Sequence, residues 1–212
     1  MNPYTFIFIG RSGCGKGTQV ELLQKYITEN RPHEEIFYLE TGERFRNFIK
    51  EDSYSSQLSR KVYESGDRQP SFLAIWMWSH LLVESFKGTE HLIIDGSPRA
   101  YSEALAMDTA LKFYGRKAYV IHLNVSRKWS EDRLLSRGRV DDIDLAKVKK
   151  RLDWFEEDVV PAINFFTCFW PLPQNEHFKG SVPSPRRAKL ILLKDFLKLI
   201  IKRNATLKYP QK

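Results

Sequence analysis

Short runs of consecutive apolar residues alternate along the chain with longer segments in which apolar residues recur at a helical period. Uninterrupted apolar runs are typical of strands buried on both faces of a parallel sheet. The pattern predicts four such strands, at 4–9, 36–39, 91–94 and 118–123. It predicts helices at 16–29, 42–50, 55–65, 71–86, 102–114, 128–136, 144–166 and 188–202. The alternation indicates an α/β fold with a doubly wound parallel sheet, for which we expect five strands, the last within 170–185.

The composition indicates a globular protein rather than a disordered or fibrous one. Of 212 residues, 42% are hydrophobic and 28% are charged, and we expect residues 1–212 to form a single domain. No apolar run approaches the roughly 20 residues of a membrane-spanning helix. Two cysteines, Cys14 and Cys168, provide neither a disulfide framework nor a four-cysteine zinc site. We therefore expect no zinc and a cytoplasmic location.

The net charge of +8 comes from the end of the chain. Residues 183–212 contain nine basic residues and one acidic residue, Asp195, whereas the rest is formally neutral. Such a segment can contact nucleic acid or an anionic membrane, and those partners remain open. We favour a solvated basic surface on a helix and tail, because most charged surfaces have no further role.

A glycine-rich loop follows the first predicted strand and precedes the first predicted helix. Glycines let backbone N–H groups point at phosphate oxygens, the helix N-terminus adds positive potential, and Lys16 adds a charge for the β- and γ-phosphates. The arrangement predicts a nucleotide phosphate site. The loop reads Gly10-Arg11-Ser12-Gly13-Cys14-Gly15-Lys16-Gly17-Thr18-Gln19.

This loop resembles that of adenylate kinases and other nucleoside monophosphate kinases. The general phosphate-loop motif has Ser or Thr where this chain has Gly17, and the hydroxyl follows at Thr18. The resemblance implies a P-loop kinase domain that binds ATP. The implied ATP-binding residues are Gly13, Cys14, Gly15, Lys16, Gly17, Thr18 and Arg133.

Three later motifs support the resemblance on the acceptor side. Residues 40–46, Glu-Thr-Gly-Glu-Arg-Phe-Arg, resemble Ser-Thr-Gly-Asp-Leu-Leu-Arg; residues 65–70 resemble Lys-Gly-Glu-Leu-Val-Pro; residues 95–99, Asp-Gly-Ser-Pro-Arg, resemble Asp-Gly-Phe-Pro-Arg. They imply a helical acceptor-binding segment over 41–72. The implied acceptor residues are Thr41, Gly42, Arg46, Gln69, Gly96, Arg99 and Glu103.

One carboxylate in these motifs suits a metal ion. Asp95 follows a predicted parallel strand beside the phosphate loop, a position that suits Mg²⁺ bound through water. The Thr18 hydroxyl is the second candidate. Mg²⁺ is the cofactor that we expect.

The acceptor base remains open because position 103 departs from the family. Adenylate kinases have Gln there, which both donates and accepts hydrogen bonds, whereas an ionised Glu103 only accepts and suits guanine better than adenine N1. Thr41 favours AMP, since the pyrimidine-specific relatives carry a smaller residue there. We favour AMP, with GMP, pyrimidine or broad specificity as alternatives.

An arginine-rich stretch follows the fourth predicted strand. Residues 133–142 and 149–152 resemble the short-lid pattern Arg-Leu-Leu-x-Arg-Gly…Gly-Arg-Val-Asp-Asp…Lys-Lys-Arg-Leu, with a minimal lid at 137–142. The resemblance implies that Arg133 stacks on the donor base and that Asp141 and Asp142 order the lid. One residue of extra spacing leaves Lys150 as an alternative to Arg151. The implied catalytic residues are Lys16, Arg99, Arg133, Arg137, Arg139 and Arg151.

These patterns together predict a phosphotransferase. The resemblance covers about residues 4–166 and implies a reversible reaction, ATP + AMP ⇌ 2 ADP. Phosphoryl transfer needs charge stabilisation and positioning, which converging arginines supply. We expect a monomer. The alternatives are a non-catalytic nucleotide-binding module with a basic tail and a sugar or shikimate kinase, both disfavoured by the acceptor motifs.

Overall fold

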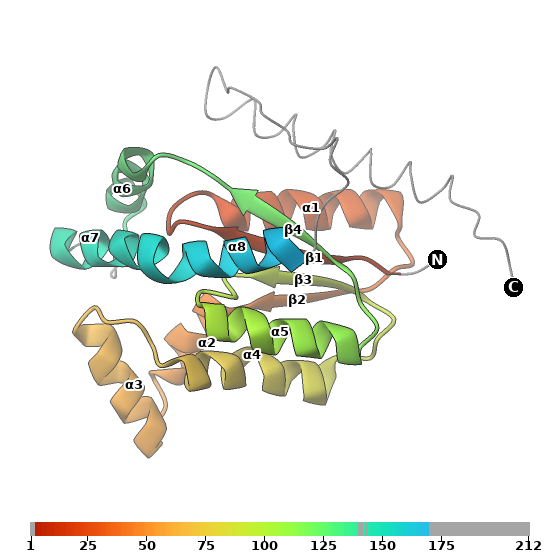
Figure 1. Ribbon diagram of the computed structural model, residues 1–212, viewed down its shortest axis with the longest axis horizontal. Helices are drawn as coiled ribbons and strands as arrows, with labels where there is room; N and C mark the ends of the chain where they lie inside the picture. The colour runs from red at the N-terminus through yellow and green to blue at the C-terminus, as the bar shows by residue number, and fades with distance from the viewer. Residues whose placement is uncertain (1–2, 140–141, 143, 170–212) are drawn as a thin grey trace, which may run out of the picture. The chain divides into compact units, whose positions relative to one another are not determined.

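A parallel sheet forms the centre of the part of the chain that the computed structural model describes, residues 3–139, 142 and 144–169. Its strands are β1 (Thr5–Gly10), β2 (Ile36–Glu40), β3 (His91–Asp95) and β4 (Ala118–Leu123), in the order β2-β3-β1-β4 (Figure 1). All four predicted strands are present, each within one residue of its expected bounds. The expected fifth strand and the helix at 188–202 lie outside the described residues, as does the basic segment 183–212.

The helices lie where the periodicity predicts them. Three begin with a side-chain cap: Ser53, Ser126 and Asp144 accept hydrogen bonds from backbone N–H groups of the first turn. The helical segments are α1 (Lys16–Asn30), α2 (Thr41–Phe48), α3 (Tyr54–Glu64), α4 (Ser71–Ser85), α5 (Tyr101–Phe113), α6 (Arg127–Ser136), α7 (Leu145–Trp154), η2 (Phe155–Val159) and α8 (Val160–Phe169). None of these is long and apolar enough to cross a membrane.

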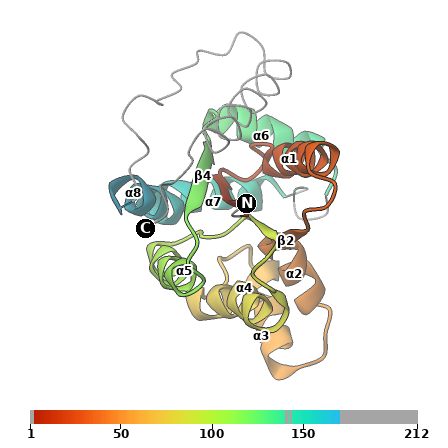
Figure 2. The ribbon, with the colours of Figure 1, turned by 90° about the vertical axis from the view of Figure 1, so that its right-hand side faces the viewer.

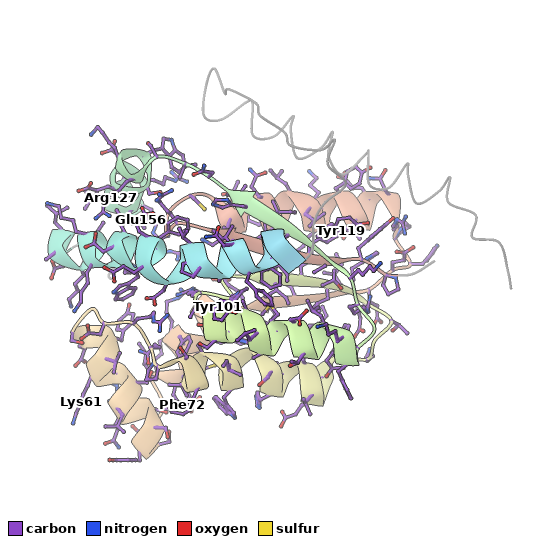
Figure 3. All side chains as sticks on the ribbon, in the orientation of Figure 1. Lys61, Phe72, Tyr101, Tyr119, Arg127 and Glu156 are labelled. Carbon is purple, nitrogen blue, oxygen red and sulfur yellow. The ribbon has the colours of Figure 1, made fainter. Side chains whose placement is uncertain are left out.

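Helices cover both faces of the sheet (Figure 2). On one face, Ile7 and Ile94 belong to a buried cluster with Trp78 of α4 and Met107 of α5. Helix α8 extends this layer, and the Phe165 ring meets Tyr101 of α5 edge to face with the centroids 5.7 Å apart (Figure 3). On the other face α1 packs against β1 and β3. Burial on both faces explains why β1 and β3 are largely apolar, whereas the outer strands β2 and β4 are only partly buried.

The predicted helix 144–166 is wrong in its middle, where the turn widens into the π-helical segment η2. Pro161 follows this segment. It has no N–H to donate to the carbonyl of Glu157, and its ring would clash with that carbonyl in a regular α-helix. A wider turn just before the proline relieves both problems.

The parallel register brings the carboxyl ends of the strands to one edge. Asp95 is paired with Glu40 of β2 on one side and with Phe8 of β1 on the other. Because β1 is hydrogen-bonded to β3 and β4, its following loop opens at the point where the strand order reverses. Ligands of open α/β sheets bind at such an edge. Helices α2 and α3 extend beyond it (Figure 1).

Candidate functional site

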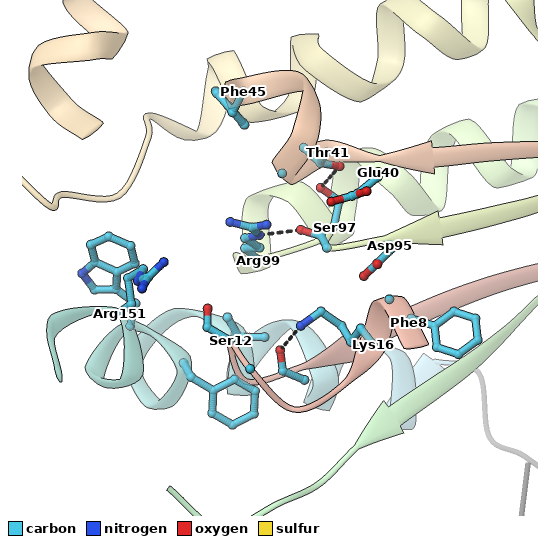
Figure 4. A pocket seen from close by; sticks show the side chains of 18 of the residues that line it. Phe8, Ser12, Lys16, Glu40, Thr41, Phe45, Asp95, Ser97, Arg99 and Arg151 are labelled. Carbon is cyan, nitrogen blue, oxygen red and sulfur yellow. Dashed lines mark hydrogen bonds between the residues drawn. The ribbon is translucent and has the colours of Figure 1, made fainter. Parts of the chain in front are cut away.

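The glycine-rich loop between β1 and α1 adopts a backbone path that only glycine follows easily. Gly13 and Gly15 have φ of 78° and 92°, and a Cβ at Gly13 would lie 2.9 Å from Cγ of Leu134. The Lys16 ammonium donates to the carbonyl oxygens of Gly10 at 2.9 Å and Arg11 at 3.1 Å (Figure 4). The lysine charge is thus held across the loop at the N-terminus of α1, an arrangement that suits a bound polyphosphate.

The carboxylate of Asp95 is buried at the end of β3. Its Oδ1 has no hydrogen-bond partner among the described residues, whereas its Oδ2 lies 3.4 Å from the Tyr38 hydroxyl. Burial raises the pKa of Asp95 above its usual range, and the nearby Lys16 charge acts in the opposite direction. An unsatisfied buried carboxylate oxygen suits a hydrated cation, and the Thr18 hydroxyl lines the same pocket. These two side chains therefore fit a Mg²⁺ ion.

No larger metal cluster competes with this pair. Within the described ranges, no group of three or more His, Cys, Asp and Glu side chains is arranged to hold a metal. Mg²⁺ keeps several waters and is usually bound by one or two carboxylates together with substrate phosphates. A small number of oxygen ligands from the protein is therefore sufficient for such an ion.

Two guanidinium groups converge at the opposite wall of the pocket. A Cβ at Gly42 would lie 3.4 Å from both Nη1 of Arg46 and Nη2 of Arg99, so both guanidinium groups reach the same point of this wall. Thr41 is buried, and its Oγ1 lies 2.9 Å from the Ser97 hydroxyl. This convergence of positive charge at the start of α2 suits a second anion.

The Gly96–Arg99 turn brings Glu103 to the same wall. The Arg99 Nε donates to the Gly96 carbonyl at 2.5 Å, and the Arg99 backbone N–H donates to Oε2 of Glu103 at 3.1 Å. The Glu103 side chain is 2% exposed, and burial raises its pKa. The carboxyl thus lines the pocket instead of turning into solvent.

Gln69 has a different environment from the other acceptor candidates. Its amide oxygen accepts from the Ser59 hydroxyl at 2.8 Å, and its amide nitrogen donates to the Ser59 carbonyl at 2.9 Å. Both ends of the amide are engaged, which ties the loop before α4 to α3. Gln69 lines the pocket, but both hydrogen bonds of its side-chain amide hold the loop against α3.

The predicted lid arginines meet at Asp142. Arg137 donates to both carboxylate oxygens of Asp142, and Arg151 donates to Oδ1. Burial acts to raise the pKa of Asp142, but the two guanidinium groups outweigh it and hold the pKa below its usual range. Asp141 lies outside the described residues.

The structure also separates Arg151 from its neighbour Lys150. Lys150 forms an ion pair with Asp67 at 2.5 Å, whereas Arg151 lines the pocket with Arg139. Arg133 reaches the same pocket from α6. Three elements thus bring arginines to one side of the cavity.

One cavity of about 990 Å³ connects these groups. Two of the predicted site residues that the structure describes do not line it: Cys14, which is buried within the loop, and Asp142, which is paired with Arg137 and Arg151. The residues that do line it are Gly13, Gly15, Lys16, Gly17, Thr18, Thr41, Gly42, Arg46, Gln69, Asp95, Gly96, Arg99, Glu103, Arg133, Arg137, Arg139 and Arg151. The cavity lies at the large end of the range for small-molecule sites.

Two charged residues close to the site were not predicted as functional: Glu40 lines the cavity, and Arg11 lies in the phosphate loop without lining it. Arg11 donates to Glu156 Oε1 at 2.7 Å and to the Val125 carbonyl at 2.8 Å, and its guanidinium lies 4.3 Å from the centroid of the Phe155 ring. Glu40 Oε1 accepts from Nη2 of Arg46 at 3.1 Å. Both residues lie inside recognised motifs, and their charge within those motifs was the sequence feature that could have identified them.

Comparison with known proteins identifies the family. A model of the family described as adenylate kinase matches residues 8–169. The chain is 32% identical to an adenylate kinase of Porphyromonas gingivalis strain W83 over 166 residues, which cover 76% of this chain and 81% of that protein. It is 30% identical to an adenylate kinase of Flavobacterium psychrophilum, with 76% and 83% covered. It is 31% identical to human adenylate kinase isoenzyme 5, covering 74% of this chain and 27% of that protein. The chain therefore belongs to the adenylate kinase family and is a phosphotransferase of the nucleoside monophosphate kinase type.

Proposed function

We propose that the protein catalyses reversible, Mg²⁺-dependent transfer of the γ-phosphoryl group of ATP to AMP, giving two molecules of ADP. The observation that supports this most is the single cavity, which has the phosphate loop at one wall and the Arg46–Arg99 pair at the other. A triphosphate on the loop and a monophosphate at the arginine pair would share this cavity. Proximity of two bound reactants is the main contribution that a kinase needs to make.

The proposed roles follow from the charges. Lys16 and the loop N–H groups hold the donor phosphates, and Arg46 and Arg99 hold the acceptor phosphate. An acceptor phosphate oxygen forms a bond to the γ-phosphorus as the bond from that phosphorus to the β,γ-bridging oxygen breaks. No general base is required, because the acceptor oxygen is already anionic. We assign stabilisation of the charge on the transferring group to Arg137, Arg139 and Arg151, and stacking on the donor base to Arg133.

We assign Mg²⁺ to Asp95 and Thr18. A bound Mg²⁺ would neutralise phosphate charge and orient the donor. The unpartnered Oδ1 of Asp95 supports this assignment. Asp95 also shares the pocket edge with Lys16, so the protein offers one anionic and one cationic group to the donor phosphates.

AMP is the acceptor that we favour, with GMP as a second candidate. The side chain of Glu103 favours GMP when ionised, because a carboxylate accepts from the two N–H groups of guanine. Thr41, which is buried at the same wall, supports AMP, because the pyrimidine-specific relatives carry a smaller residue at that position.

A coupled assay of ADP formation, run with ATP and each of AMP, GMP, CMP, UMP and dTMP, tests the proposal. We expect turnover with AMP to exceed that with the others, and chelation of Mg²⁺ to abolish it. Lys16→Met should lower kcat by at least about a hundredfold, the usual effect of removing one electrostatic contact to the transition state. Turnover with none of the five acceptors would refute the kinase function.

The finer architecture belongs to the same proposal. It includes a fifth strand beyond the described residues, a minimal lid at 137–142, a cytoplasmic monomer, and a basic segment 183–212 without a nucleic-acid partner. Salt-dependent oligonucleotide binding that disappears when 183–212 is deleted would contradict the last point.

A further inference from the structure

Glu40 places a negative charge at the wall where the two acceptor-side guanidinium groups meet. It is the last residue of β2, and its Oε1 lies 3.1 Å from Nη2 of Arg46. Both side chains are about one third exposed, at 28% for Glu40 and 34% for Arg46, so the pair opens to the pocket and is only partly screened by water.

Distances from Gly42 show that this carboxylate lies close to both arginines. A Cβ built there would lie 3.4 Å from Arg46, 3.4 Å from Arg99 and 4.0 Å from Glu40 Oε1. One point thus has two guanidinium nitrogens and one carboxylate oxygen around it. An anion bound between the two arginines would therefore lie close to the Glu40 carboxylate.

The strand register keeps Glu40 at this wall. Glu40 is paired with Asp95 across β2 and β3, and the Tyr38 hydroxyl lies 3.5 Å from Glu40 and 3.4 Å from Asp95. Burial raises the pKa of Asp95, and the Glu40 charge acts in the same direction, as expected for two neighbouring carboxylates. Repulsion from Asp95 on one side and attraction to Arg46 on the other favour the observed ion pair.

We propose that Glu40 is an internal anion that competes with the acceptor's phosphate group for Arg46. This inference rests on the proposed function, because it takes the Arg46–Arg99 wall as the monophosphate site. A monophosphate that binds there either displaces the Glu40 carboxylate from Arg46 or remains beside its negative charge. Both events weaken acceptor binding, so Glu40 sets the affinity for the acceptor below the value that the arginines alone would give.

The expected size of the effect follows from the exposure of the pair. Partly exposed ion pairs contribute up to about 1 kcal/mol, which corresponds to a factor of about five. Removing the charge of Glu40 also removes repulsion of a phosphate that carries up to two charges. We therefore expect neutral substitutions to tighten acceptor binding about threefold to tenfold, and to leave the donor KM within twofold.

Glu40→Gln and Glu40→Ser test the proposal, with Glu51→Gln as the matched control. Glu51 lies in the same acceptor segment, is exposed and does not line the cavity. Calorimetry with AMP alone gives Kd, and the coupled assay gives KM for AMP and for ATP. Both neutral variants should lower the Kd and KM of AMP, and the control should change neither. Two different neutral side chains guard against a local defect of one variant.

Unchanged or weaker AMP binding in folded Glu40→Gln and Glu40→Ser would overturn the inference and would indicate that Glu40 orients Arg46. This result is distinguishable from failure of the proposed function, which is the absence of ADP formation by the unsubstituted protein with every acceptor. If no acceptor turns over, calorimetry with inorganic phosphate still compares the variants: tighter phosphate binding without Glu40 supports the competition, and equal binding refutes it.

Discussion

Replacing Arg11 by alanine removes a side chain that joins the phosphate loop to the segment before α6 and to η2. Arg11 lies in the phosphate loop, Val125 precedes α6, and Glu156 and Phe155 belong to η2. The ion pair with Glu156, which is 45% exposed, contributes about 0.5–1 kcal/mol. The bond to the Val125 carbonyl adds about 1–1.5 kcal/mol, and the Phe155 ring adds about 0.5–1 kcal/mol. We predict that Arg11→Ala lowers the free energy of unfolding by about 2–3.5 kcal/mol, and Tm by about 4–14 °C for a chain of this length.

Urea and thermal unfolding measure this loss, with Arg127→Ala as the control. Arg127 also pairs with a carboxylate, Asp153, at 2.6 Å and donates to the Lys149 carbonyl at 3.3 Å, but its side chain is 39% exposed, so its removal should cost at most about 1.5 kcal/mol. A double-mutant cycle of Arg11→Ala with Glu156→Gln should give a coupling energy of about 0.5–1 kcal/mol. A loss no larger than that of Arg127→Ala, or a coupling energy near zero, would refute the reasoning that Arg11 anchors the loop to η2.

Three further predictions concern single positions. Glu103→Gln should lower the KM for AMP about twofold to tenfold and raise that for GMP, because an amide both donates and accepts; kinetics with both acceptors check this, and an unchanged AMP-to-GMP ratio would contradict it. Gly17→Ala should leave the unfolding free energy unchanged or raise it by up to about 1 kcal/mol, because nothing lies within 4 Å of the added Cβ, whereas Gly13→Ala should lower it by about 1–2 kcal/mol or more, because its φ is 78°. The buried His91 ring accepts a hydrogen bond from the Tyr4 N–H at 2.9 Å, and burial lowers the pKa of His91. The contribution of His91 to stability is therefore full above pH of about 6.5 and is lost as the pH falls through the lowered pKa of the folded protein. Urea unfolding at stepwise lower pH measures this loss, and a free energy of unfolding that rises below pH of about 6.5 would contradict the prediction.

The sequence was sufficient for the features that depend on local pattern. Apolar runs of strand length predicted β1 to β4, most clearly for β1 and β3, which are buried on both faces and therefore show no polar alternation. The glycines around Lys16 predicted the phosphate loop because its backbone path excludes most other residues. The family resemblance predicted which arginines to examine, and the structure brings those of its described part to one cavity.

Features that depend on pairing between distant segments were not predictable in the same way. Glu40 and Gln69 both lie in recognised motifs, but only the packing of neighbouring elements shows that one pairs with Arg46 and the other with Ser59. Arg151 and Lys150 are adjacent in sequence, and the rotation of α7 decides which one lines the pocket. Periodicity over 144–166 did not reveal the wider turn, because one extra residue barely changes an apolar pattern of that length.

The widened turn η2 separates two helical segments that pack in different hydrophobic clusters. Before it, Val148 and Leu152 pack with Leu134 beneath the arginines, and after it, Ala162 and Phe166 pack in the main core. Each residue of an α-helix turns the chain by about 100°, so a single deletion within Phe155–Val159 would point one of these stripes away from its cluster. Natural insertions or deletions in this stretch should therefore be rarer than substitutions, and length here is a stricter constraint than residue identity.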